Sequence, residues 1–218
     1  MYYILSRDVE LPELGCRISP MQADGAHIQS ADSAHELLEA LGQQLAGAVS
    51  SYDLAVIGGS ALLARGLVDR ATRDVDVVAI ASPNGLQSAV TLPKELTAAV
   101  ERVARDFEIP NDWLNSEPAG LLRFGLPIGF ESRWETRSYG DSLTVRWASR
   151  FDQIHFKLYA AVDQAGKHLQ DLEALHPTRD ELIAAARWTR EHDPSEGFLS
   201  ALFEALKYFG VEDADLRP

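Results

Sequence analysis

The sequence contains a single cysteine, Cys16, so no disulfide can form within the chain, and its Cys and His residues show no zinc-ligand spacing. It has no apolar run near the ~20 residues that a membrane-spanning helix requires. Its first charged residues, Arg7 and Asp8, come too early for a secretory signal peptide. We therefore expect a cytoplasmic protein with no membrane partner.

Positive charge is also scarce. The 218 residues carry 20 Lys+Arg against 33 Asp+Glu, a formal net charge of −13. Because phosphate neutralisation dominates the affinity of proteins for nucleic acids, this balance argues against binding through a large basic face. The hydrophobic content of 46% is ordinary for a globular protein and argues against disorder.

The hydrophobic periodicity predicts a mixed α/β chain followed by a helical C-terminal third. The first thirty residues suggest irregular structure with a short strand at 2–6, and a helix is expected from Ser33, where Ser33 to Glu36 have the form of a capping box. Strands are expected at 54–57 and 74–80, and a β-hairpin at 130–139 and 142–148. Further helices are expected at 60–67, 92–107, 150–165, 171–175, 178–192 and 195–209.

The most informative stretch covers residues 53–80. Gly58-Gly59 follows an apolar strand and lets the backbone approach a ligand, and Ser60 opens a helix whose free N–H groups favour phosphate. Asp74 and Asp76 are separated by one residue in a strand, so both carboxylates are expected on one face, roughly 7 Å apart at Cα. Like charges this close are costly unless a cation lies between them. Mg²⁺ typically takes one or two carboxylates plus substrate phosphates, so the stretch predicts phosphoryl or nucleotidyl transfer.

Each motif also has a simpler interpretation. Gly-Gly after a strand is common, and an Asp-x-Asp pair is more often the solvated edge of a strand. A dinucleotide-binding fold also opens with a strand, a glycine turn and a helix, but residues 58–61 lack the G-x-G-x-x-G spacing. Arg70 and Arg73, beside the aspartates, offer another alternative, because they could neutralise the pair without a metal ion.

The order of motifs in residues 54–76 resembles a known superfamily. An apolar strand leads through Gly-Gly-Ser-Ala and a helix ending in Arg-Gly-Leu to Arg-x-Thr-x-Asp-x-Asp. This order is similar to the polymerase-β-like nucleotidyltransferases, in particular their minimal bacterial branch with the AbiEii and MenT toxins. Weaker similarity occurs at 112–115, 129–133, 157–160 and 171–172.

The resemblance implies an α/β (α+β) fold, with a nucleotidyltransferase-type mixed β-sheet flanked by helices and a helical C-terminal region. We accordingly divide the chain into residues 1–49, an N-terminal segment and helix packed on the core, residues 50–148, a nucleotidyltransferase-like core, and residues 149–218, the C-terminal helices.

The resemblance also implies site residues. The nucleotide, a nucleoside triphosphate, would be held by Gly58, Gly59, Ser60, Arg70 and Lys157. Asp74 and Asp76 would bind Mg²⁺ or Mn²⁺, and the catalytic set would be Asp74, Asp76, Lys157 and Asp171. Lys157 lies in an apolar stretch, and a lysine there can also simply extend from the helix edge to solvent. A third carboxylate is common in such enzymes, and its candidates are Glu131, Glu135 and Asp141.

The expected activity is Mg²⁺-dependent transfer of a nucleoside monophosphate from a nucleoside triphosphate to an acceptor hydroxyl. The resemblance implies a tRNA 3′ end or another RNA as acceptor, in a toxin–antitoxin or phage-defence setting with a cognate antitoxin as partner. The alternative is a catalytically degenerate member of the fold that binds a nucleotide or a partner protein.

Overall fold

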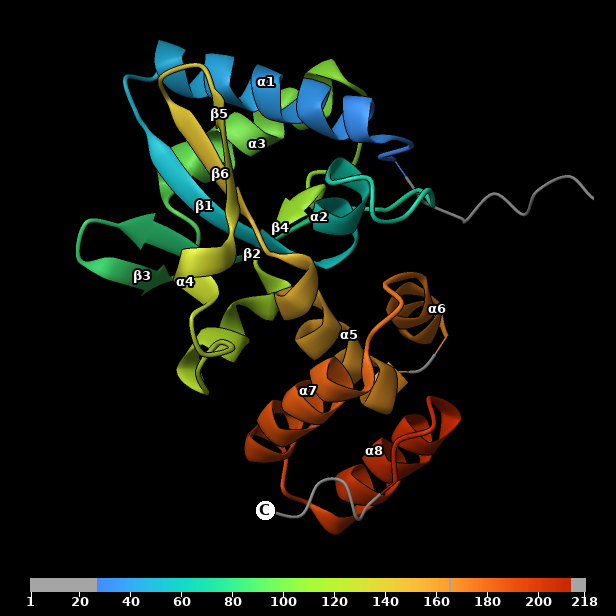
Figure 1. Ribbon diagram of the computed structural model, residues 1–218. Helices are drawn as coiled ribbons and strands as arrows, with labels where there is room; N and C mark the ends of the chain where they lie inside the picture. Colours follow the sequence, from blue (N-terminus) through green and yellow to red (C-terminus); the bar gives the residue numbers. More distant parts are fainter. Residues whose placement is uncertain (1–26, 165, 213–218) are drawn as a thin grey trace, which may run out of the picture.

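A mixed sheet of six strands forms the centre of the fold, and helices cover both of its faces (Figure 1). The computed structural model describes residues 27–164 and 166–212, so the expected strand at 2–6 and Cys16 lie outside the described residues. The strand order is β3-β2-β1-β6-β5, with β4 paired to β2 off this path. The strands are β1 (Tyr52–Ile57), β2 (Val75–Ser82), β3 (Gly85–Ser88), β4 (Leu114–Asn115), β5 (Glu135–Tyr139) and β6 (Leu143–Trp147). The expected α/β fold with a mixed, helix-flanked sheet is thus confirmed.

Strand β1 lies in the centre of the sheet. It pairs antiparallel with β2 and parallel with β6. Strands β5 and β6 form the expected antiparallel hairpin, but residues 130–133, expected as part of its first strand, form a short helix instead. The turn after β2 returns the chain as β3, which was not expected from the sequence and pairs antiparallel with β2.

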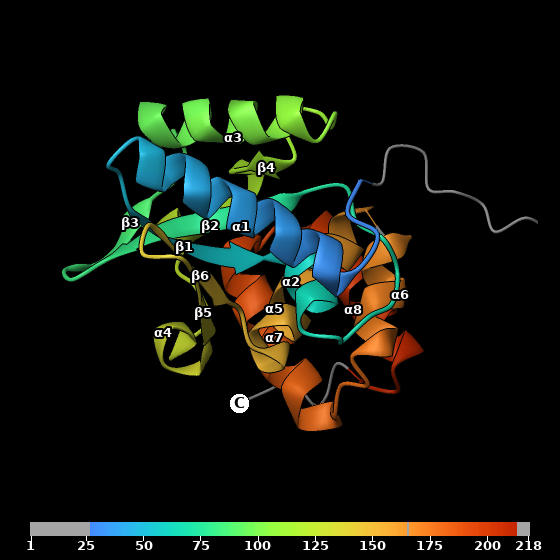
Figure 2. The same ribbon diagram turned by 90° about the horizontal axis from the view of Figure 1, so that it is seen from above.

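Two helices, α1 (Ala31–Gly47) and α3 (Lys94–Asp106), lie together on one face of the sheet (Figure 2). Their apolar side chains join those of the strands in one buried cluster, which includes Leu38, Leu41 and Val100. Helix α1 was expected to begin with a capping box at Ser33. It begins three residues earlier, because Ser30 is the N-cap and its side chain exchanges hydrogen bonds with Ser33.

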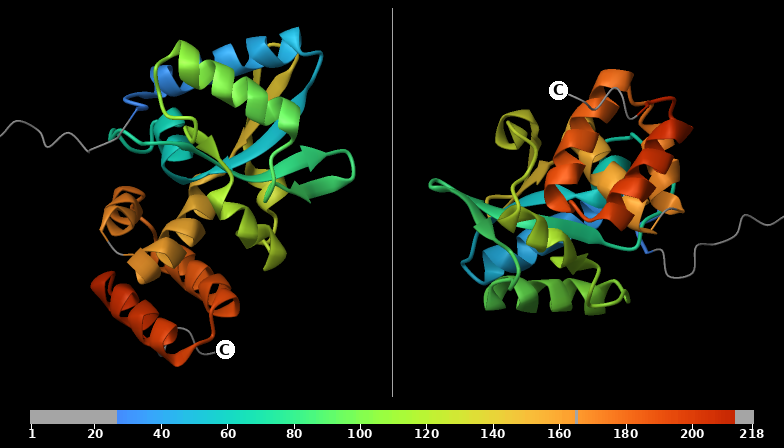
Figure 3. Two further views of the ribbon diagram at one scale, coloured as in Figure 1. Left: turned by 180° about the vertical axis from the view of Figure 1, so that it is seen from behind. Right: turned by 90° about the horizontal axis from the view of Figure 1, so that it is seen from below.

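The C-terminal helices gather on the opposite side of the molecule (Figure 3). They are α5 (Arg150–Gln164), α6 (Lys167–Ala174), α7 (Arg179–His192) and α8 (Glu196–Tyr208). Helix α7 begins with a capping box, in which Thr178 and Glu181 exchange the two hydrogen bonds. The apolar side chains of these helices form a buried cluster of their own. Leu62 of α2 (Gly58–Ala64), the helix that directly follows β1, also belongs to this cluster.

Side chains along β2 point alternately to the two faces of the sheet, and this alternation determines which face the functional side chains are on. Val75 and Val77 are fully buried in the cluster beneath α1 and α3, so Asp76 between them faces the side of the C-terminal helices. That side is also covered by a 3₁₀ helix, η1 (Glu117–Arg123), and by the short helix α4 (Phe130–Arg133). None of the described helices combines the length and the apolar character needed to cross a bilayer.

Candidate functional site

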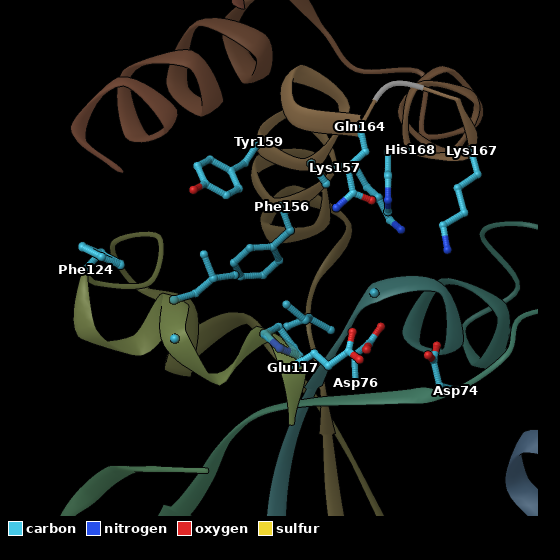
Figure 4. A pocket seen from close by; sticks show the side chains of 16 residues that line it. Asp74, Asp76, Glu117, Phe124, Phe156, Lys157, Tyr159, Gln164, Lys167 and His168 are labelled. Atoms are coloured by element: carbon cyan, nitrogen blue, oxygen red, sulfur yellow. The ribbon is translucent and has the colours of Figure 1, made fainter. Parts of the chain in front are cut away.

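A cavity of about 530 Å³ separates β2 and η1 from α5 and α6 (Figure 4). Its wall combines charged groups from all four elements with an apolar portion. The residues that line it are Ile57, Gly58, Asp74, Asp76, Glu117, Pro118, Gly120, Leu121, Phe124, Phe156, Lys157, Tyr159, Ala160, Gln164, Lys167 and His168.

Asp74 and Asp76 both line this cavity, as the sequence predicts. Asp76 lies in β2, where it is in register with Ile57 of β1 and Asn115 of β4. Burial and, to a smaller extent, the charge of Asp74 raise the pKa of Asp76 to about 7, although Lys157 and a hydrogen bond from Asn115 act in the opposite direction. Asp74 precedes β2, and burial raises its pKa as well. The folded chain therefore holds two carboxylates whose negative charge is poorly compensated.

The neighbouring arginines do not pair with these aspartates in the described part of the chain. A guanidinium nitrogen of Arg70 lies 2.5 Å from Asp171, and one of Arg73 lies 2.7 Å from Asp112. The alternative in which arginines neutralise the aspartate pair directly is therefore not what the structure shows.

A third carboxylate is present, but it belongs to Glu117 rather than to the residues expected. Glu117 begins η1, lines the cavity, and its charge raises the pKa of both Asp74 and Asp76. The candidates lie elsewhere: Glu135 pairs with Arg65 at 3.1 Å, Glu131 lines a separate hollow, and Asp141 is exposed in the β5–β6 turn. Sequence reasoning missed Glu117 because only the pairing of β4 with β2 brings it beside the aspartates. Pro118 indicates that a helix starts at this point, but it does not indicate which residues lie beside that helix in the fold.

The two glycines after β1 make room for protein groups. Gly58 has φ +80°, and a Cβ there would lie 2.2 Å from Asp76 Oδ2, while a Cβ on Gly59 would lie 2.6 Å from Thr72 Oγ1. The N–H of Gly58 donates to Gln153 Oε1 at 3.2 Å. Of the five residues expected to hold the nucleotide, Gly58 and Lys157 line the cavity, whereas Gly59, Ser60 and Arg70 do not. Ser60 is fully buried, and its hydroxyl has no hydrogen-bond partner in the described structure.

Lys157 and Asp171 form a buried ion pair at the roof of the cavity. Lys157 Nζ lies 2.7 Å from Asp171 Oδ2, and Arg70 donates two hydrogen bonds of 2.5 Å to the same carboxylate. Burial lowers the pKa of Lys157; it would raise that of Asp171, but the hydrogen bonds and charges of Arg70 and Lys157 lower it. Lys157 lines the cavity and is 3% exposed, so it does not extend to solvent. Asp171 instead lies behind it, where it positions Lys157 and Arg70.

The start of α6 adds two further groups to the wall of the cavity. The Lys167 side chain extends toward Asp74 and lowers the pKa of that carboxyl (Figure 4). His168 also lines the cavity, and its Nδ1 is buried without a hydrogen-bond partner in the described structure. Burial, together with the charges of Lys157 and Lys167, lowers the pKa of His168 to about 4, so the imidazole is neutral near pH 7.

Comparisons with known proteins give no match to a family model, a curated protein or a solved structure.

The donor set fits a hard divalent cation that shares its ligands with a substrate. No group of three His, Cys, Asp or Glu side chains within residues 27–164 and 166–212 is placed to hold a metal ion by itself. Mg²⁺ commonly uses one or two carboxylates and completes its shell with water and substrate phosphates. Asp74 and Asp76 can supply the carboxylates, and Lys157 and Lys167 face them from the opposite wall, where they can meet phosphate charge.

Proposed function

We propose that this protein is a Mg²⁺-dependent nucleotidyltransferase that moves a nucleoside monophosphate from a nucleoside triphosphate to an acceptor hydroxyl. The observation that carries the proposal is the wall of the cavity. Three carboxylates, Asp74, Asp76 and Glu117, face the same space as two lysines, and none of the three pairs with an arginine among the described residues. Opposed carboxylates and lysines are the arrangement that a metal–triphosphate complex requires, because the metal needs oxygen ligands and the phosphates need cations.

Different residues of the cavity wall would bind the metal ion, bind the phosphates and accept the proton. Asp74 and Asp76 would hold Mg²⁺, which when bound neutralises charge on the triphosphate and on the leaving group. Lys157, fixed by Asp171, and Lys167 would bind the phosphates. The acceptor oxygen forms a bond to the α-phosphorus, the bond from that phosphorus to the bridging oxygen breaks, and pyrophosphate leaves. Glu117 is the remaining carboxylate and would accept the proton of the hydroxyl.

The acceptor proposed first is an RNA hydroxyl, the tRNA 3′ end, because the resemblance of residues 54–76 points to that branch of nucleotidyltransferases. A net charge of −13 works against tight binding of tRNA by the free chain. Growth arrest on expression, relieved by substitution of Asp76 and by the product of a neighbouring gene, would support a toxin with a cognate antitoxin.

A transfer assay tests the activity directly. Purified protein is incubated with each α-labelled nucleoside triphosphate, Mg²⁺ or Mn²⁺, and total tRNA, beside Asp74→Asn, Asp76→Asn and Glu117→Gln. Asp112→Asn is the matched control, because Asp112 is also an aspartate near β2 but pairs with Arg73 and does not line the cavity. Label transfer should be lost in the three site variants and retained in the control. Transfer that survives Asp76→Asn would refute the proposal.

A second candidate is a degenerate nucleotidyltransferase fold that binds nucleotide without transferring it. Two observations favour it: Asp171 is held in ion pairs behind the cavity wall, and the Ser60 hydroxyl does not reach the cavity. Binding of a nucleoside triphosphate that depends on Asp74 and Asp76, without label transfer to any acceptor, would establish this candidate instead.

A further inference from the structure

The cavity has two chemically different ends. The charged end contains Asp74, Asp76, Glu117, Lys157 and Lys167, described above. The other end, here called the aromatic end, is formed by Leu121, Phe124, Phe156 and Tyr159. Figure 4 shows Phe124 and Tyr159 at the side of the cavity away from Asp74, with Phe156 between them and the carboxylates. A ligand that fills the cavity must therefore combine a charged portion with a flat apolar one.

Phe124 is the unusual member of the aromatic end, because 67% of its surface is exposed. A single exposed apolar side chain is ordinary on a protein surface. Phe124, however, follows η1 directly, and the backbone of the next residue, Gly125, is held by side chains of α7. The carbonyl oxygen of Gly125 accepts a hydrogen bond from Trp188 Nε1 at 3.1 Å, and His192 Nε2 lies 2.9 Å from the same oxygen. Two side chains of α7 thus fix the backbone that presents the Phe124 ring to solvent.

The opposite wall of the aromatic end is equally well fixed. The Tyr159 ring contacts Trp188 and His192 with centroid distances of 6.0 Å each, and Phe198 at 5.5 Å. The Phe124 ring lies 5.9 Å from the same His192. Since both rings pack against one histidine, they border one space, and their positions do not depend on a ligand. Preorganised rings of this kind stack on flat ligands at a low entropic cost.

We propose that the aromatic end is the subsite for the base of the nucleotide, with the Phe124 ring as its stacking platform. The identity of the ligand rests on the proposed function, because the charged end supplies the site for the triphosphate. The aromatic end offers ring faces and one tyrosine hydroxyl rather than sets of hydrogen-bond donors and acceptors. Stacking, which every base can make, would therefore dominate the recognition.

The test compares two ligands that differ in the nucleoside. Affinities for Mg²⁺–ATP and for Mg²⁺–tripolyphosphate are measured by calorimetry on the unaltered protein, Phe124→Leu, Phe124→Tyr and Ile128→Ala. Leucine keeps an apolar side chain without a ring face, and tyrosine keeps the ring. Ile128 is the matched control because it is 96% exposed and lines a separate hollow near the same loop.

ATP should bind the unaltered protein about tenfold more tightly than tripolyphosphate, in line with the usual contribution of one stacked base. Phe124→Leu should remove most of this difference and leave the affinity for tripolyphosphate unchanged, while Phe124→Tyr and Ile128→Ala should preserve it. Equal affinities for the two ligands, or an unchanged ATP affinity in Phe124→Leu, would overturn the subsite alone. Absence of binding by both ligands would instead overturn the proposed function.

Discussion

Gly58 and Asp76 are packed so closely that the glycine limits which side chain can occupy its position. A methyl group on Gly58 would lie 2.2 Å from Asp76 Oδ2, and the residue has φ +80°. Gly58→Ala should therefore destabilise the fold by about 2–4 kcal/mol, from steric overlap and left-handed backbone strain together. It should also weaken Mg²⁺ binding, because the carboxylate of Asp76 must move.

Gly66→Ala is the control for Gly58→Ala. Gly66 has φ +64°, but a Cβ there meets nothing within 4 Å, so only the backbone strain of about 1–2 kcal/mol should appear. Denaturant unfolding and Mg²⁺ titration of both variants check the prediction. Equal losses of stability in the two variants would show that the contact with Asp76 does not matter.

The raised pKa of Asp76 predicts how stability changes with pH. Its pKa is 3.8 for the ordinary carboxyl and about 7 in the folded protein. Between these values the folded state holds a proton that the unfolded state has lost, so this group lowers stability as pH rises toward about 7. Asp76→Asn removes the effect. The gain in free energy of unfolding from Asp76→Asn should thus grow from near zero at about pH 4 to roughly 2–4 kcal/mol above pH 7.

Urea unfolding of the unaltered protein and of Asp76→Asn, without divalent cations, measures that difference across the pH range. Added Mg²⁺ should stabilise the unaltered protein above pH 7 more than at pH 5, and should not stabilise Asp76→Asn. A difference between the two proteins that stays constant from pH 4 to 8 would contradict the raised pKa.

At the scale of elements, one buried carboxylate ties α6 to α5 and to the loop before β2. Asp171 of α6 accepts from Lys157 of α5 and from Arg70 at once, and its side chain is 1% exposed. Removing one partner of a buried pair leaves an uncompensated charge, which typically costs about 3–5 kcal/mol. Asp171→Leu should lose that much stability, because Lys157 remains buried without its carboxylate.

The double variant Lys157→Met/Asp171→Leu separates loss of charge pairing from loss of packing. It should recover most of the stability, since it replaces the ion pair with apolar side chains and Arg70 is near enough to the surface to turn toward water. Lys207→Ala is the control, as the exposed Lys207–Glu204 pair should contribute nothing measurable to chemical unfolding. A double variant as unstable as Asp171→Leu would assign the loss to packing.

The elements that could be predicted from the sequence are those with a strong local signal. The helix expected at 178–192 needed only periodicity and is confirmed. The hairpin around Gly140 is confirmed as well, except that residues 130–133 of its expected first strand are helical. Strand β4 and η1 were not among the expected elements. The two residues of β4 carry no periodicity, and the strand exists only because it pairs with β2. Glu117 was missed for the same reason. Asp74 and Asp76 were found because they are close together in the sequence at the start of one strand, whereas the burial of Ser60 depends on tertiary packing.

At the scale of the whole molecule, the cavity lies between two separately packed parts. The sheet with α1 and α3 has one buried cluster, and the C-terminal helices have another. Helix α5 belongs to both parts: Phe156 packs in a cluster with β1 and β2, while Ile154 and Leu158 pack with α6, α7 and α8. A ligand in the cavity would touch β2 and η1 on one side and α5 and α6 on the other, so it would link the two parts.

Binding of Mg²⁺ with a non-hydrolysable nucleoside triphosphate should therefore slow amide hydrogen exchange on both sides of the cavity at once, in η1 (Glu117–Arg123) and in α6 (Lys167–Ala174). The midpoint of thermal unfolding should rise with ligand concentration, as for any ligand that binds only the folded state; at 100 times the dissociation constant the stabilisation is about 2.7 kcal/mol. Asp76→Asn should show neither effect with Mg²⁺ present. Slower exchange in α6 alone, with η1 unchanged, would mean that the ligand binds the helical side only and that Glu117 takes no part.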